Sequence, residues 1–115
     1  MKVEILYSPG CPNHPPTVSR LREALAQEGV SAEVVQVEVN DLATALLMGF
    51  LGSPSVRIEG QDVEPSAGFS NRIGMMCRTY SIAGQLSGVP PMEWLRKAVR
   101  EANECGTSLS GGGLK

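Results

Sequence analysis

In the first third of the chain, the spacing of apolar residues changes from that of a strand to that of a helix and back to that of a strand. This order constrains the fold more than any other feature of the sequence. Residues 2–7 carry apolar side chains on both faces, which is typical of a central strand covered on both sides. From Val18 to Leu25 the apolar side chains instead recur at helical spacing, and Gly29 ends this helix. Residues 31–39 alternate again as a strand does. A strand, a helix and a strand in this order predict a parallel pair joined by a right-handed crossover.

The chain after residue 39 continues with shorter elements. The predicted elements are a helix over residues 42–50, a strand over 55–59, a short antiparallel partner over 62–64 and a last helix over 92–102. Asn40 or Asp41 is expected to cap the first of these helices, and Pro90 and Pro91 introduce the last. Residues 65–90 show no clear period. The order β-α-β-α-β-β-α predicts an α/β three-layer sandwich, in which helices cover both faces of a small mixed sheet.

Length and charge exclude several classes of protein. A chain of 115 residues can bury one core, and we expect one domain over 1–103 followed by a flexible Gly- and Ser-rich tail over 104–115. The formal net charge is -2 without a basic stripe, which argues against a nucleic-acid partner. No apolar run approaches the roughly 18 residues that span a bilayer. The N-terminus lacks the pattern of a signal peptide, so we expect a cytoplasmic protein without a membrane partner.

The sequence contains three cysteines, Cys11, Cys77 and Cys105. Three thiols without a signal peptide argue against a secreted scaffold held together by disulfides. Redox chemistry, metal binding and nucleophilic catalysis all remain open, and so does burial of the thiols as small apolar side chains. Cys105 lies beside the predicted tail, and we expect it to have no role.

Two loops of the predicted fold are candidates for a functional site. Cys11 follows the first strand, in a loop over residues 8–16, and it precedes the first helix. Ligands of open α/β sheets lie beyond the carboxyl ends of the strands, and the positive end of a helix dipole stabilises a thiolate. Ser53 and Pro54 precede the third predicted strand, where a cis proline would form a tight turn.

These two loops resemble those of the thioredoxin-fold superfamily, and the resemblance covers about residues 1–103. It rests on the first strand, the Ser-Pro-Gly-Cys-Pro loop that contains Cys11, and the Gly-Ser-Pro-Ser-Val-Arg-Ile-Glu-Gly stretch at 52–60. It implies a thioredoxin-like fold with Pro54 as the cis proline. A dithiol thioredoxin would have its second cysteine where this chain has His14, so the usual short disulfide cannot form here.

A narrower resemblance concerns residues 74–80 and 88–90. They are similar to segments of small bacterial thioredoxin-like proteins, in which an early Cys-Pro-Asn loop accompanies a later Cys-Arg-x-Tyr; some of these proteins are labelled alkylmercury lyase. The resemblance implies a bacterial protein in which Cys11 is the better exposed nucleophile and Cys77 the resolving thiol. The loop over 65–80 would then fold back over the carboxyl end of the sheet and bring the Cα atoms within about 7 Å.

Three further residues are assigned supporting roles, and for two of them a simpler alternative exists. His14 either shifts Cys11 toward the thiolate or is a solvated residue at the helix start. Arg78 either holds a thiolate or an anionic substrate, or forms a surface salt bridge. Pro54 is structural, and its loop also shapes the surface that a substrate meets.

Three functions remain open at this point. The first is a thiol-disulfide redox protein, an oxidoreductase whose partner is a protein or small-molecule thiol or disulfide. The second is a thioredoxin-fold interaction module without catalysis. The third is a protein that handles a soft metal or organomercury, with Cys11 and Cys77 as the ligands. No Gly-rich loop lies between a strand and a helix, so we predict no cofactor, and the sequence predicts no oligomeric state.

Overall fold

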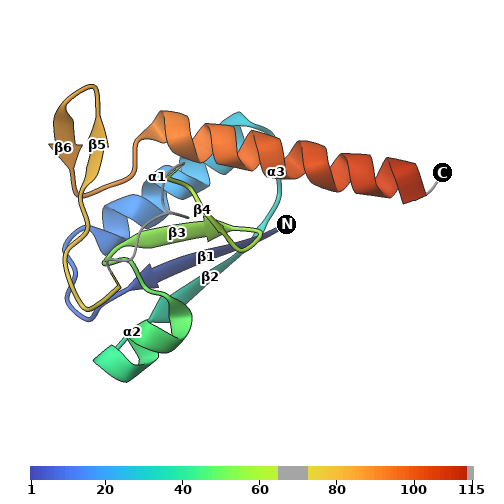
Figure 1. The fold of residues 1–115 in the computed structure, drawn as a ribbon. Helices are drawn as coiled ribbons and strands as arrows, with labels where there is room; N and C mark the ends of the chain where they lie inside the picture. Colours follow the sequence, from blue (N-terminus) through green and yellow to red (C-terminus); the bar gives the residue numbers. More distant parts are fainter. Residues whose placement is uncertain (65–72, 114–115) are drawn as a thin grey trace.

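Strand β1 lies at the centre of the fold. A computed structural model describes residues 1–64 and 73–113, with side chains up to residue 104 except that of Ile82. The elements are β1 (Lys2–Tyr7), α1 (His14–Gln27), β2 (Glu33–Glu38), α2 (Leu42–Met48), β3 (Ser55–Ile58), β4 (Gln61–Asp62), β5 (Tyr80–Ile82), β6 (Gln85–Ser87) and α3 (Met92–Gly113). Their arrangement is shown in Figure 1.

The main sheet has the strand order β2-β1-β3-β4. Strand β1 pairs with β2 in parallel and with β3 antiparallel, while β3 and β4 form an antiparallel hairpin. Helix α1 connects these two parallel strands, as the strand-helix-strand order of the sequence predicts. The mixed sheet and the α/β class are therefore confirmed.

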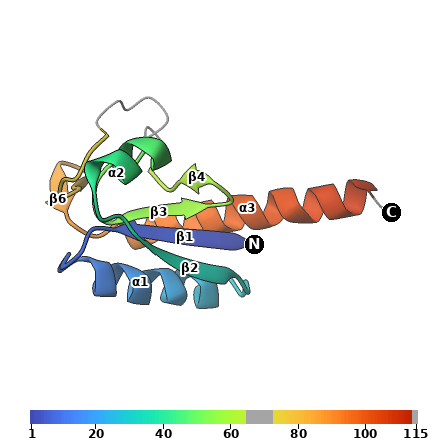
Figure 2. The ribbon, with the colours of Figure 1, turned by 90° about the horizontal axis from the view of Figure 1, so that it is seen from below.

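Apolar side chains fill the space on both faces of this sheet. On one face, Val3 and Ile5 of β1 pack with α1 and α3 in a cluster that includes Leu21 and Leu95. On the other face, Leu6 packs with Val39, Ala45 and Phe50, around α2. Figure 2 shows α1 and α2 on opposite sides of the strands. The expected three layers are present.

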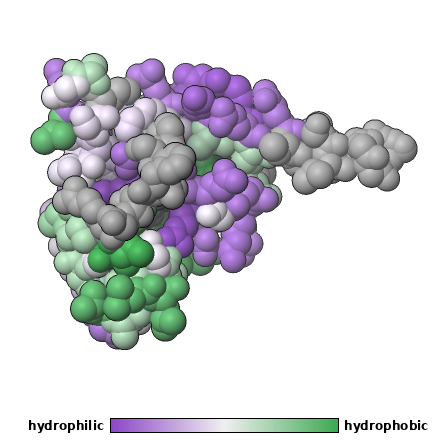
Figure 3. Space-filling view, in the orientation of Figure 1, coloured by the Kyte–Doolittle hydropathy of each residue, from purple (hydrophilic) through white to green (hydrophobic). Residues whose placement is uncertain are grey.

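Helix α2 covers its face of the sheet with few residues. The Asp41 carboxylate caps the helix by accepting a hydrogen bond from the Thr44 N–H at 2.7 Å. The helix ends at Met48, earlier than predicted, because Gly49 adopts a left-handed conformation with φ of 63°. The outer side chains of Leu42, Leu46 and Leu47 are exposed, and Figure 3 shows hydrophobic surface gathered over α2.

A second hairpin, formed by β5 and β6, lies within residues 65–90, where the sequence shows no hydrophobic periodicity. Its two-residue turn is formed by Ala83 and Gly84, both with positive φ. Such turns favour asparagine or glycine at the first position, so an alanine there gives almost no turn signal in the sequence. The described residues of β5 and β6 other than Tyr80 are exposed, which also removes the alternation that marks a half-buried strand.

Helix α3 is longer than predicted, because it continues to Gly113 through most of the expected tail. No proline follows Pro91, so nothing in the sequence interrupts the backbone hydrogen bonds of the helix. Residues 114–115 lie outside the described residues. Figure 1 shows the last turns of α3 projecting beyond the sheet. None of the described helices is long and apolar enough to cross a membrane.

Glu28 connects the end of α1 to α3 through two arginines. Its carboxylate accepts hydrogen bonds from Arg96 Nε at 2.8 Å and from Arg100 Nη2 at 3.2 Å. The hydrogen bonds from Arg100 and Arg96 hold the pKa of Glu28 below its ordinary value. These contacts lie at the opposite end of α1 from Cys11.

A Glu28→Gln variant should lower stability in a pH-dependent way. Because the pKa of Glu28 is lower in the folded state, its contribution is fully present above the ordinary value of 4.5 and is lost as the pH falls through the folded value. The urea midpoint of the variant should therefore be reduced at neutral pH and should approach that of the natural protein in acid, once the pH has fallen below the lowered pKa of Glu28. Glu33→Gln, at an exposed position, is the control. An equal deficit for Glu28→Gln at both pH values would contradict the ion-pair assignment.

Candidate functional site

The loop with Cys11 leaves the carboxyl end of β1 through two consecutive turns. The Cys11 N–H donates to the Ser8 carbonyl at 3.2 Å, and the His14 N–H donates to the Cys11 carbonyl at the same distance. Helix α1 begins at His14, with Asn13 at the N-cap position. Cys11 is thus placed at the expected end of the sheet, just before the helix, and it is half-buried.

The helix start offers Cys11 fewer backbone donors than its position suggests. Pro12, Pro15 and Pro16 have no N–H, and the N–H of His14 is already bonded to the Cys11 carbonyl. The Thr17 N–H and hydroxyl both donate to the Asn13 carbonyl, at 3.2 and 2.7 Å. The stabilisation of a Cys11 thiolate by helix N–H groups is therefore weaker than the sequence position implies.

His14 is oriented toward the strands. Its ring stacks on Tyr7 with a centroid separation of 3.7 Å, and its Nε2 lies 2.7 Å from the Gln36 side-chain oxygen. Tyr7 and Gln36 come from β1 and β2. These contacts fix the imidazole at the helix start and give it a packing role there.

The loop of Ser53 and Pro54 contacts the Cys11 loop directly. The Ser53–Pro54 peptide bond is cis, as expected. Ser53 is 1% exposed, and its Oγ accepts a hydrogen bond from the Ser8 N–H at 3.0 Å. The side chain of Ser53 therefore holds the cis-proline loop against the turn that contains Cys11.

The segment that contains Cys77 lies on the other side of Ser53. The Ser53 N–H donates to the Met76 carbonyl at 2.8 Å, and the Arg78 N–H donates to the Ser53 carbonyl at 2.9 Å. Cys77 thus faces Ser53 in a parallel β-bridge. Of the loop expected to fold back over the sheet, residues 76–78 pair with Ser53, and residues 65–72 lie outside the described residues.

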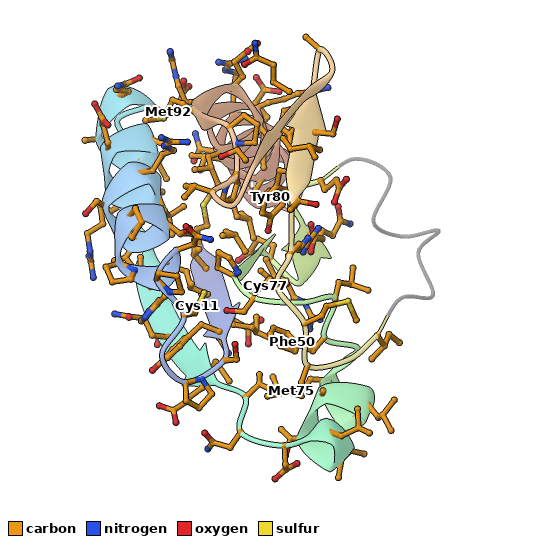
Figure 4. The ribbon with its side chains drawn as sticks, turned by 90° about the vertical axis from the view of Figure 1, so that its left-hand side faces the viewer. Cys11, Phe50, Met75, Cys77, Tyr80 and Met92 are labelled. Atoms are coloured by element: carbon orange, nitrogen blue, oxygen red, sulfur yellow. The ribbon has the colours of Figure 1, made fainter. Side chains whose placement is uncertain are left out.

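Cys11 and Cys77 lie on neighbouring loops, both with free thiols (Figure 4). Cys77 is exposed and Cys11 is half-buried, so the prediction that Cys11 is the better exposed thiol was wrong. The difference in exposure is local: Cys77 lies on the exposed segment that bridges to Ser53, and Cys11 lies in the loop on the other side of Ser53. Two thiols on loops joined through one serine can exchange a disulfide with a substrate.

Two glycines allow the segment to approach these loops closely. A Cβ on Gly52 would lie 3.1 Å from the Met76 carbonyl oxygen and from the Arg78 Cβ, and the φ of Gly52 is 110°. A Cβ on Gly88 would lie 2.2 Å from the Asn13 side-chain nitrogen. The chain from Met76 to Gly88 therefore packs against both loops of the candidate site.

Arg78 points inward and is 6% exposed, in place of the surface salt bridge that was the simpler expectation. It binds Asp62 through both terminal nitrogens at 2.7 and 2.8 Å, Glu64 at 2.8 Å and the Ser55 hydroxyl at 2.9 Å. Burial opposes the charged form, but the hydrogen bonds that Arg78 donates to Asp62 and Glu64 and the negative charges around it together outweigh burial and raise the pKa of Arg78. Arg78 is thus a permanent cation bound to the β3–β4 hairpin.

Tyr80 completes the attachment of this segment. Its ring lies under the Arg78 guanidinium at 4.6 Å, and its hydroxyl donates to the Pro54 carbonyl. Burial raises the pKa of Tyr80; the positive charge of Arg78 opposes this effect, and the negative charges of Asp62 and Glu64 add to it. The Cys-Arg-x-Tyr motif was a signal for this cluster. The partners Ser55, Asp62 and Glu64 were missed, because no local pattern marks them.

No group of three or more His, Cys, Asp and Glu side chains that could hold a metal ion occurs among the described residues. A soft metal at Cys11 and Cys77 would thus have two thiolates as its protein ligands.

Replacing Ser53 by alanine should weaken the contact between the two loops. The change leaves the Ser8 N–H without its acceptor, which costs about 1–3 kcal/mol when the group is buried. Urea unfolding should show this loss, whereas Ser31→Ala at an exposed position should stay within about 0.5 kcal/mol of the natural protein. Equal stabilities of the two variants would contradict the assigned role of the Ser53 hydroxyl.

The comparison with known proteins supports the same fold. A model of the thioredoxin domain matches residues 1–64, which contain the Cys11 loop, the cis proline and the β3–β4 hairpin. The match ends before the segment with Cys77. No curated protein matches the sequence. On the family match, the cis proline and the sheet topology, this chain belongs to the thioredoxin-domain family.

Proposed function

We propose that this protein is a cytoplasmic thiol-disulfide redox protein. Cys11 is its nucleophile, Cys77 is its resolving thiol, and its substrate is a disulfide of a protein or a small molecule. The observation that carries the proposal is the position of Ser53, which bonds to the Cys11 loop through its side chain and to both neighbours of Cys77 through its backbone. Both thiols are free, which is the state that reduces a disulfide.

The reaction proceeds in two exchange steps. The Cys11 thiolate attacks one sulfur of the substrate disulfide, so a mixed disulfide forms and the first substrate thiolate leaves. The Cys77 thiolate then attacks the Cys11 sulfur, so the Cys11–Cys77 disulfide forms and the second substrate thiolate leaves. The substrate gains two electrons, and the two protein thiols lose them together with two protons. A second thiol or dithiol must afterwards reduce the protein.

The exposed position of Cys77 suits the resolving step. Its side chain is accessible on the outer segment, while the backbone on either side is held by Ser53. The proposed resolving step requires the exposed Cys77 side chain to rotate toward the half-buried Cys11. His14 occupies the position of the second cysteine in a dithiol thioredoxin, and Cys77 takes over the resolving function from outside the helix.

Mapping the disulfide tests the proposal most directly. A Cys105→Ser protein serves as the reference, so that the third thiol cannot rearrange the pair. After mild oxidation, alkylation and digestion, mass spectrometry should find one peptide pair joined through Cys11 and Cys77, and dithiothreitol should separate it. The bond closes a long loop of the unfolded chain and should stabilise the oxidised protein by about 4 kcal/mol. Two free thiols after oxidation would refute the pairing.

Single cysteine variants separate the two roles. In the Cys105→Ser background, Cys11→Ser should abolish reduction of a disulfide substrate, because the attacking sulfur is gone. Cys77→Ser should instead accumulate the mixed disulfide at Cys11, which mass spectrometry detects as a substrate adduct. Trapping at Cys77 in the Cys11→Ser protein would reverse the assigned order. Unchanged turnover in both variants would favour a non-catalytic interaction module.

The alternative of a soft-metal or organomercury-handling protein uses the same two thiols. Two thiolates suit Hg²⁺ as linear ligands. That alternative predicts that purified protein retains metal, that alkylation of Cys11 and Cys77 releases it, and that metal blocks formation of the disulfide. Metal-free protein that reduces disulfides supports the redox function.

A further inference from the structure

We propose that Arg78 is a positioning residue for the cysteine pair, because it holds the Cys77 segment on the β3–β4 hairpin and so sets how readily Cys77 reaches Cys11. The inference rests on the proposed redox function and adds a residue that controls it. It assigns to Arg78 no contact with a substrate.

The first observation is the geometry around the guanidinium. Nη1 bonds to Asp62 Oδ2 at 2.7 Å and to Ser55 Oγ at 2.9 Å, while Nη2 bonds to Asp62 Oδ1 at 2.8 Å and to Glu64 Oε1 at 2.8 Å. Two parallel bonds to one carboxylate fix the orientation of an arginine, and ionised partners strengthen each bond. The Asp62 side chain is 10% exposed and that of Arg78 is 5% exposed, so water screens this pair little.

These bonds also exclude a direct role at the thiolate. Both terminal nitrogens are directed at the hairpin, and the face of the guanidinium lies over Tyr80. The positive charge is matched by Asp62 and Glu64, so it adds little attraction for an anionic substrate. Arg78 therefore acts on the adjacent Cys77 through the backbone.

The second observation is that two side chains shortly after Cys77 anchor the same segment. Arg78 attaches it to the hairpin, and the Tyr80 hydroxyl attaches it to the Pro54 carbonyl of the cis-proline loop. Between these anchors and Met76 the backbone pairs with Ser53. Cys77 is therefore held against the cis-proline loop, which itself contacts the loop that carries Cys11, and this placement would raise the effective concentration of its thiol near Cys11. Loss of either side-chain anchor leaves the segment attached through the other anchor and through the backbone bonds to Ser53.

The test compares three variants in the Cys105→Ser background. Arg78→Lys keeps the charge but cannot form the two parallel bonds. Tyr80→Phe removes only the bond to Pro54 and keeps the ring under Arg78. Glu28→Gln removes a more exposed arginine–carboxylate contact at the opposite end of α1 and is the control. For each protein, the fraction of Cys11–Cys77 disulfide is measured at equilibrium with oxidised and reduced dithiothreitol, by acid quenching, alkylation and mass analysis, and stability is measured by urea unfolding.

We expect Arg78→Lys to lower the equilibrium constant for the Cys11–Cys77 disulfide by about tenfold. Tyr80→Phe should lower it by about threefold, and Glu28→Gln should leave it unchanged even though it reduces stability. If Arg78→Lys does not fold, Tyr80→Phe decides the outcome. A positioning role requires this separation, because a merely structural residue would change stability without changing the redox equilibrium.

Two negative results are distinguishable. If the reference protein forms no Cys11–Cys77 disulfide, the proposed function fails and this inference fails with it. If the disulfide forms in the reference protein and the folded Arg78→Lys and Tyr80→Phe proteins have the same equilibrium constant, only the positioning role is overturned.

Discussion

The hydrogen bonds of Ser53 are the constraint on which the candidate site depends. Its Oγ accepts from the Ser8 N–H, and its N–H and carbonyl pair with Met76 and Arg78. The cis bond to Pro54 and these three contacts lie in one short stretch of the chain. Through it, the end of β1, the start of β3 and a segment from the second half of the chain meet at one place.

The second constraint is the cost of burying Arg78. A buried guanidinium without partners is strongly unfavourable, and removing one partner of a buried pair typically costs about 3–5 kcal/mol. Asp62 and Glu64 provide the compensation, and both lie on or just after β4. The short β3–β4 hairpin therefore has a role beyond completing the sheet, since it is the base to which the Cys77 segment is attached. The positioning role proposed for Arg78 would account for a polar cluster here, because it assigns the cluster to placement of that segment as well as to stability.

Most of the fold could be predicted because its signals are local. The alternation in β1 and β2, the apolar spacing of α1 and the Asp41 cap each depend on residues a few positions apart. The segment over 73–90 could not be predicted in the same way. Its structure depends on contacts between residues far apart in the sequence, such as Arg78 with Asp62 and Tyr80 with Pro54. Its hairpin turns at Ala83 and Gly84, which give no strong turn signal. The relative exposure of the two thiols follows from that segment, so it could not be predicted either.

In the proposed function, a resolving thiol on a distant segment would make the redox reaction depend on tertiary structure. In a dithiol motif within one helix turn, local backbone geometry sets the distance between the sulfur atoms. Here His14 packs on Tyr7 at the equivalent position, and the second thiol lies 66 positions from Cys11 in the sequence. Its approach is governed by the bridge to Ser53 and by the buried contacts of Arg78 and Tyr80. On this proposal, side chains that never contact the substrate would tune the reducing power of the pair, because each would alter the free energy of closing the disulfide.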